Sequence, residues 1–148
     1  MPEPDREFQQ RLLTTFRGEA EEHVRAISGG LIDLENTPRV EERAQIVEKI
    51  FREAHSLKGA ARAVNLKEIE TICQSMEGIL AQAKRREIAI TADALDVLHR
   101  AMDEIERLLM ATRGERPEKG PSNAANLLSR LEAISRGSAA VELSGQPD

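Results

Sequence analysis

Residues 51–62 read Phe-Arg-Glu-Ala-His-Ser-Leu-Lys-Gly-Ala-Ala-Arg, and their spacing is typical of an amphipathic helix. Positions three, four and seven residues apart share a helix face, so His55 lies in line with Lys58, Gly59 and Arg62. The apolar residues fall mostly on the other side: Val47, Ile50, Phe51, Ala54, Leu57, Ala61 and Val64. The stretch therefore predicts a helix that buries one face and exposes a histidine among positive charges on the other.

Gly59 is the unusual residue of this exposed face. Glycine inside a helix costs about 1 kcal/mol relative to alanine, so its place beside an outward histidine needs a reason. Close approach of another molecule to the imidazole is such a reason. Arg52, one turn before His55, extends the positive patch.

Apolar residues three or four apart continue on both sides of this helix. They predict helices over residues 4–36, 38–64, 66–86, 91–112 and 122–136. The stripe of the first helix consists of Phe8, Leu12, Phe16, Ala20, Val24, Ile27, Leu31 and Leu34. Four long amphipathic helices indicate an all-α fold, an antiparallel up-down-up-down four-helix bundle with a fifth C-terminal helix on its flank or end.

Local signals mark where these helices begin and end. Pro38 suits the first position of the second helix, Asn65 suits a left-handed residue that closes it, and Thr91 suits an N-cap. Gly29 and Gly30 indicate either a bend in the first helix or a close contact with a neighbour.

The chain divides into one domain, residues 1–136, and a patternless segment, residues 137–148. A polar Gly/Pro-rich linker at 113–122 precedes the fifth helix. We expect residues 137–148 to be a disordered tail and the start of an interdomain linker, so that the chain is a fragment of a longer protein.

Composition fits a helical bundle and excludes several functions. Of the 148 residues 40% are hydrophobic, only 2% are aromatic and 32% are charged, with a net charge of −5. Interspersed charges without a basic tract argue against nucleic-acid binding, and no apolar run reaches the roughly 18 residues of a membrane span. The single cysteine, Cys73, lies at an apolar helix position and is interpreted as a core residue. A cytoplasmic location is consistent with these features.

The tight turn at Asn65 predicts which residues face His55 on the next helix. With a rise of 1.5 Å per residue, His55 and Glu77 lie roughly 15 Å and 18 Å from that turn, so they are nearly level. Gln74 comes level with the space between His55 and Lys58. We therefore expect Glu77 to accept a hydrogen bond from the imidazole, which would fix its tautomer.

The sequence His-Ser-Leu-Lys-Gly at 55–59, preceded by Ile-Phe-Arg-Glu-Ala, resembles the histidine phosphotransfer (HPt) domain of CheA-type chemotaxis histidine kinases. The resemblance covers residues 5–136 and includes the fifth helix. It implies that His55 accepts the γ-phosphoryl group of ATP from a separate kinase catalytic domain and passes it to the aspartate of a CheY-like receiver. ATP and Mg²⁺ would then belong to the kinase domain, with no cofactor or metal bound here and no enzyme activity of the domain alone.

The resemblance also implies roles for single residues. His55 would be the phosphoacceptor, and Lys58, as a mobile charge, would offset the negative charge of the phosphoryl group. Glu77 would complete the network with Lys58 and His55. The receiver would dock on a face centred on Arg52, Lys58, Gly59 and Arg62. We expect a monomer that binds neither membrane nor nucleic acid.

Three positions depart from the family pattern. Gln74 stands where CheA-type domains have a second histidine of the network, and it cannot titrate. Arg62 and Asn65 stand where glycine is usual, and Arg62 adds a charge to the docking face. These departures bear on reactivity and partner choice.

Three other readings compete with phosphotransfer. A di-metal site needs paired Glu-x-x-His motifs, but the residues three before His23, His55 and His99 are not glutamates, so this reading is rejected. His23 and His99 are interpreted as boundary or surface residues. An independent ATP-using kinase is disfavoured because the chain is short and has no Gly-rich phosphate loop. An adaptor bundle would also need the apolar stripes of these helices, but it does not explain the outward Gly59.

Overall fold

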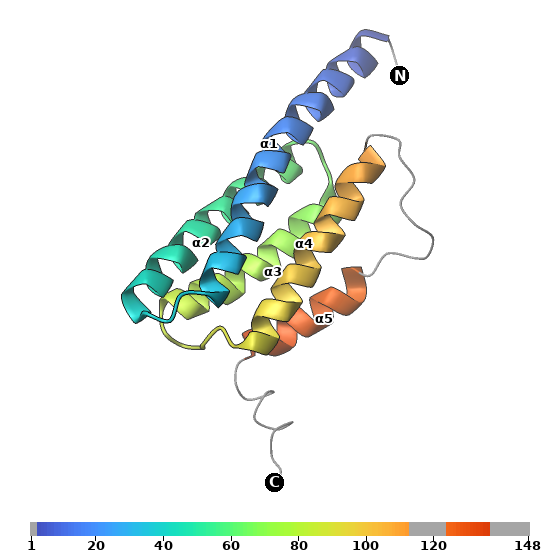
Figure 1. The fold of residues 1–148 in the computed structure, drawn as a ribbon. Helices are drawn as coiled ribbons and strands as arrows, with labels where there is room; N and C mark the ends of the chain where they lie inside the picture. The colour runs from blue at the N-terminus through green and yellow to red at the C-terminus, as the bar shows by residue number, and fades with distance from the viewer. Residues whose placement is uncertain (1–2, 113–123, 137–148) are drawn as a thin grey trace.

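The structure is a computed structural model that describes residues 3–112 and 124–136. In this part of the chain every element is an α-helix: α1 Glu3–Glu35, α2 Val40–Ala63, α3 Lys67–Lys84, α4 Ala92–Thr112 and α5 Ala124–Ser135. The first four run antiparallel to their chain neighbours, and α5 packs on the flank of the bundle against α3 and α4 (Figure 1). The predicted five-helix architecture is confirmed. None of the described helices combines the length and the apolar character needed to cross a membrane.

The interior of the bundle is aliphatic, as the composition predicts. Each of α1 to α4 contributes a stripe to one continuous core. The largest fully buried side chains are Ile27, Leu31, Leu34, Ile50, Leu57, Ile69, Ile72, Met76, Ile79, Leu80, Leu98 and Met102. Cys73 is also fully buried, as expected. The two faces of α2 thus differ as the sequence indicates, since its apolar stripe is in the core.

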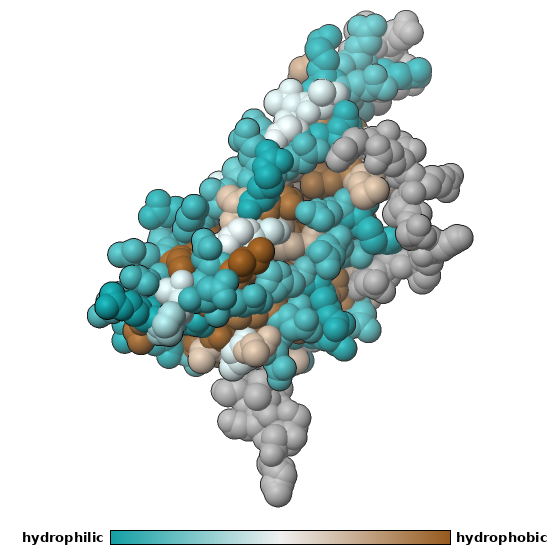
Figure 2. Space-filling view, in the orientation of Figure 1, coloured by the Kyte–Doolittle hydropathy of each residue, from teal (hydrophilic) through white to brown (hydrophobic). Residues whose placement is uncertain are grey.

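The first turns of α1 extend beyond the other helices (Figure 1). Phe8 and Leu12 are 55% and 40% exposed, so the expectation that the buried stripe begins at Phe8 is wrong. Their spacing matches the stripe, but no helix of the described residues covers them, and the first buried residue of α1 is Phe16. Figure 2 shows a mainly hydrophilic surface on the visible side of this projecting end.

α1 is an unbroken helix through Gly29 and Gly30. They have different surroundings. A Cβ atom at Gly30 would lie 2.7 Å from Cγ1 of Ile50, whereas one at Gly29 would meet nothing within 4 Å. Gly30 is therefore a close contact between α1 and α2, which confirms that alternative for Gly30.

The turn between α2 and α3 has the conformation that the sequence predicts. Asn65 has a φ of 64°. Its amide N donates to the carbonyl of Arg62 at 3.1 Å, and the amide N of Leu66 donates to the carbonyl of Ala61 at 2.9 Å. These two bonds form a Schellman motif. They reverse the chain within three residues and fix α3 against α2 at this end.

The other predicted helix ends have mixed outcomes. Thr91 caps α4, because its hydroxyl accepts the amide N–H of Ala94 at 3.1 Å. Pro38 does not occupy the first position of α2; that helix begins at Val40 after Arg39, which has an extended backbone and makes no side-chain cap. The predicted linker at 113–122, the first two residues of the predicted fifth helix (122–123) and the tail at 137–148 lie outside the described residues.

Two arginines organise the opposite end of the bundle. Arg43 donates to three main-chain carbonyls, Leu34 at 2.7 Å, Thr37 at 3.2 Å and Ile90 at 3.2 Å, and so joins the end of α1 to the link between α3 and α4. Arg86 closes α3 with a φ of 63° in a second Schellman motif. The sequence analysis identified neither role.

Candidate functional site

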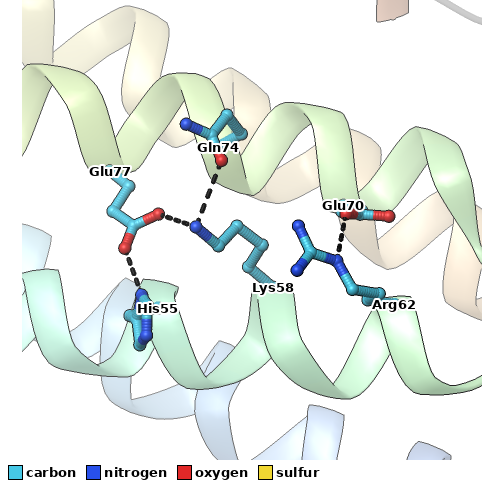
Figure 3. A network of polar contacts seen from close by, with 6 residues as sticks. All are labelled: His55, Lys58, Arg62, Glu70, Gln74 and Glu77. Carbon is cyan, nitrogen blue, oxygen red and sulfur yellow. Dashed lines mark hydrogen bonds and ion pairs between the residues drawn. The ribbon is translucent and has the colours of Figure 1, made fainter.

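His55 stands on the exposed face of α2 opposite Glu77 of α3. Its Nδ1 is hydrogen-bonded to Oε2 of Glu77 (Figure 3). The two side chains differ in exposure, at 63% for His55 and 11% for Glu77. The prediction that Glu77 lies level with His55, counted from the turn at Asn65, is therefore confirmed. The carboxylate lies deeper in the seam between α2 and α3 than the imidazole does.

Lys58 lies between the two helices instead of in solvent. Its Nζ is 2.6 Å from Oε1 of Glu77 and donates to Oε1 of Gln74 at 3.1 Å (Figure 3). Its side chain is only 14% exposed. In this structure the charge of Lys58 is paired with Glu77, and its ammonium group also donates to Gln74. The four residues predicted for the site thus form one network.

Electrostatics keep Glu77 ionised in this network. Burial would raise the pKa of its carboxyl, but the hydrogen bonds and positive charges of Lys58 and His55 outweigh burial and hold the pKa below its ordinary value. One turn earlier, burial and the nearby Glu77 charge raise the pKa of the Cys73 thiol to about 12. The cysteine is therefore a neutral core residue, and the site's nucleophile must be sought elsewhere.

The contact with Glu77 defines what the imidazole can do. A carboxylate only accepts hydrogen bonds, so Nδ1 carries the proton and donates it. In the neutral imidazole the other nitrogen, Nε2, then keeps its lone pair. Because His55 is mostly exposed, this arrangement presents an oriented nitrogen nucleophile at the surface, with a fixed anion behind it.

The residues predicted to dock a partner surround His55 on the same face. A Cβ atom at Gly59 would meet nothing within 4 Å, so the space above it is open. Arg62 is paired with Glu70 at 2.7 Å, and Arg52 with Glu48 at 2.9 Å. Both arginines are largely exposed. The face is therefore accessible and carries positive groups that are already paired within the domain.

Comparison with known families agrees with this geometry. Residues 11–108 match the family model of the Hpt domain. The chain belongs to the Hpt domain family. The match contains α2, α3 and the whole network around His55, so the Hpt domain includes the predicted site.

The relatives of this Hpt domain are chemotaxis kinases. It is 32% identical over 128 residues to the sensor histidine kinase CheAY of Helicobacter pylori. This alignment covers 84% of this chain and 16% of that protein. It is 26% identical over 123 residues to the chemotaxis protein CheA of Listeria monocytogenes, covering 83% of this chain and 19% of that protein. The chain thus spans less than a fifth of the length of these relatives.

A solved structure shares the fold of this Hpt domain. The phosphorylated P1 domain of CheA3 from R. sphaeroides, solved in complex with CheY6, superposes with a TM-score of 0.73. The superposition covers 85% of this chain and 96% of that one, at 17% sequence identity. This likeness confirms the helical bundle and its fifth helix.

The Hpt domain has a further contact between α2 and α3 that was not predicted from the sequence. Oε1 of Glu48 pairs with Nζ of Lys84 at 2.7 Å, and Lys84 also lies over the ring of Phe51, 4.2 Å from its centroid. The signal was present in the sequence: Glu48 is seven residues before His55, and Lys84 is seven residues after Glu77. Moving seven residues along each helix from the His55–Glu77 pair would have predicted this contact.

The remaining histidines of the Hpt domain are partly exposed, as predicted, and each has a partner on a neighbouring helix. Nδ1 of His23 is 2.6 Å from Oε1 of Glu53, and Nε2 of His99 is 3.0 Å from Oε2 of Glu35. Within the described ranges, no three His, Cys, Asp or Glu side chains are arranged to hold a metal ion.

Proposed function

We propose that this domain is a phosphoryl carrier of a two-component chemosensory system. His55 accepts the γ-phosphoryl group of ATP from a CheA-type kinase catalytic domain and donates it to the aspartate of a CheY-like receiver. The observation that carries the proposal is the hydrogen bond from His55 Nδ1 to Glu77, which leaves Nε2 as the exposed nucleophile. Membership of the Hpt family and the CheA relatives support it.

The transfer follows from this geometry. The lone pair of Nε2 forms a bond to the γ-phosphorus, while the bond from that phosphorus to the β–γ bridging oxygen breaks and ADP leaves with the electron pair. Positive charge develops on the ring, and the Glu77 carboxylate stabilises it through the Nδ1 proton. In the second step the N–P bond breaks, an aspartate oxygen of the receiver takes the phosphoryl group, and the ring returns to its neutral form.

Lys58 has an indirect role in this scheme. Fixed on Glu77 and Gln74, it keeps the carboxylate ionised and aligned, because it offsets the buried charge and occupies the second oxygen. Gln74 takes the position of the family's second histidine and supplies an uncharged acceptor for Lys58. The alignment therefore does not depend on titration at residue 74.

The domain is not the catalyst of ATP cleavage in this proposal. ATP and Mg²⁺ are held by the kinase catalytic domain, and this chain binds no cofactor and supplies the acceptor. The chain spans less than a fifth of its relatives, and we propose that it is a piece of a CheA-like histidine kinase. A cytoplasmic location follows from the use of ATP, and the isolated domain is a monomer without membrane or nucleic-acid partners.

Receiver and kinase would approach the face around Gly59. The P1 domain of CheA3 has been solved with CheY6, which supports a receiver as one partner. The open space at Gly59 allows close approach to Nε2, and Arg52 and Arg62 flank it. Alanine at Arg52 and Arg62 should weaken receiver binding, whereas alanine at Arg100 on α4 should not.

The test is phosphorylation of His55. The domain is incubated with ATP, Mg²⁺ and a CheA-type kinase core, and acid-labile phosphate is located by mass spectrometry. We expect phosphate on His55, its discharge by a CheY-like receiver, and none on a folded His55→Gln variant. Retained phosphorylation of His55→Gln would refute the site, and no phosphate with several kinase cores would favour the adaptor reading.

A further inference from the structure

The seam between α2 and α3 contains three cross-helix contacts at equal spacing. On each helix the participating residues are seven apart. Glu70 pairs with Arg62 at 2.7 Å and Lys84 with Glu48 at 2.7 Å, on either side of the Glu77–His55 hydrogen bond. We call these contacts the seam ladder: Arg62–Glu70, His55–Glu77 and Glu48–Lys84. The reacting histidine is therefore the middle member of a row that otherwise consists of ion pairs.

The two outer pairs have different surroundings along the chain. Arg62–Glu70 lies next to the Schellman turn at Asn65, whose main-chain bonds already fix α3 against α2 at that end. Glu48–Lys84 lies at the other end, and Lys84 is the last residue of α3. No tight turn joins α2 to α3 there. At this open end, side-chain contacts must fix the position of α3 along α2, which is the register of the two helices.

The Glu48–Lys84 pair is itself held in place on both sides. Lys84 lies over the ring of Phe51, one turn before His55, in the geometry of a cation–π contact. The second oxygen of Glu48 accepts from Nε of Arg52 at 2.9 Å. These bonds hold the pKa of Glu48 below its ordinary value, with Lys84 as the larger cause. Each member of the pair thus has a second contact that restricts its position, Lys84 with the Phe51 ring and Glu48 with Arg52, unlike the members of an isolated surface ion pair.

We propose that Glu48 and Lys84 are positioning residues for phosphoryl acceptance, setting the register that keeps the Glu77 carboxylate in line with Nδ1 of His55. They act through Glu77 and do not touch the reacting atoms. Rates fall steeply when aligned groups are displaced, by about a hundredfold for a 1 Å misplacement in some enzymes. The inference rests on the proposed function of His55, but its structural consequence, the His55 tautomer, can be measured independently.

The test compares two lysine variants. Lys84→Met keeps an unbranched side chain over Phe51 and removes the charge that binds Glu48. Lys49→Met is the matched control: it removes the same charge from an exposed position of α2 next to Glu48, outside the ladder. Lys84→Arg is the conservative variant, since it keeps the charge and can reach Glu48. Thermal melting of all three separates loss of fold from loss of register.

Two readouts decide the proposal. Nitrogen-15 NMR reports the tautomer of His55, and we expect Lys84→Met to lose the preference for the Nδ1–H form, while Lys49→Met and Lys84→Arg keep it. Phosphoramidate serves as the small phosphoryl donor: Nε2 attacks phosphorus, the P–N bond breaks and ammonia leaves. We expect Lys84→Met to react about tenfold more slowly than the wild type, within the range that misalignment produces.

The outcomes are separable. A Lys84→Met variant that melts at lower temperature but keeps the wild-type tautomer would overturn the positioning role, and so would a rate within twofold of the wild type. Equal losses of tautomer preference and reaction rate in Lys49→Met would show that any removed positive charge has this effect, which would also overturn the positioning role. If phosphoramidate fails to label wild-type His55, the proposed function is in doubt, and the tautomer measurement alone decides the register.

Discussion

Replacing Gly59 with alanine should make the domain more stable and less able to transfer its phosphoryl group. Gly59 lies inside α2, and a Cβ atom there meets nothing within 4 Å. The helix therefore gains the full propensity difference without a steric cost, about 0.5–1 kcal/mol in the free energy of unfolding. In a domain of this size that corresponds to a rise of about 1–4 °C in Tm.

The functional cost arises only when a partner approaches. Gly30 shows how close such an approach can be, because a Cβ there would lie 2.7 Å from an Ile50 carbon. If a partner packs on Gly59 with comparable closeness, the added methyl group costs about 1–3 kcal/mol. Transfer to the receiver would then slow by about five- to a hundredfold.

The assay follows discharge of phosphorylated domain into a receiver under single-turnover conditions. This chain contains no Trp and no Tyr, so fluorescence of a tryptophan in the receiver can be followed without background. Gly29→Ala is the control, since it also lies in open space inside a helix, but on α1. Reaction with phosphoramidate should be unchanged in both variants. Unimpaired receiver transfer by Gly59→Ala would refute the reasoning that the glycine exists for close approach.

Three further predictions concern stability. The folded pKa of Glu77 lies below its ordinary value of 4.5, so the stability that its ionised carboxylate contributes is present above that value and is lost as the pH falls through the folded pKa. Urea titrations at a series of pH values should show that the free energy of unfolding falls less steeply toward acid pH in Glu77→Gln than in the wild type. An unchanged dependence on acid pH would count against the network. Arg43→Met removes three bonds to carbonyls and should lower the unfolding free energy by about 2–3 kcal/mol, a loss that denaturant titration would detect. Arg86→Gly relieves a left-handed residue and should raise Tm, stabilising by about 1 kcal/mol, whereas Arg85→Gly, at a φ of −83°, should lower it.

Much of the site was predictable because one turn determines the register of two helices. Once Asn65 is interpreted as a left-handed closing residue, the rise per residue brings Glu77 level with His55 and Gln74 level with the space between His55 and Lys58. The structure has these neighbours in contact. The calculation succeeded because both helices are regular over this distance.

Other features depend on surroundings that spacing does not contain. The stripe of α1 continues through Phe8 and Leu12, but a periodic pattern does not tell where the neighbouring helices end. The inward position of Lys58 depends on competition between solvent and two acceptors on α3. Arg43 contacts carbonyls from two connections that are remote in sequence. Such long-range side-chain contacts with main-chain atoms leave no periodic signal.

The difference in exposure between His55 and Glu77 has an evolutionary consequence. The groups that would orient and activate the imidazole under the proposed function, Glu77 and Lys58, lie between α2 and α3, whereas Gly59 and the arginines stand at the surface. Substitutions on the surface can therefore change which receiver is recognised without disturbing the nucleophile. Reactivity and partner choice can diverge separately after gene duplication, so one bundle can supply several signalling pathways that remain insulated from one another.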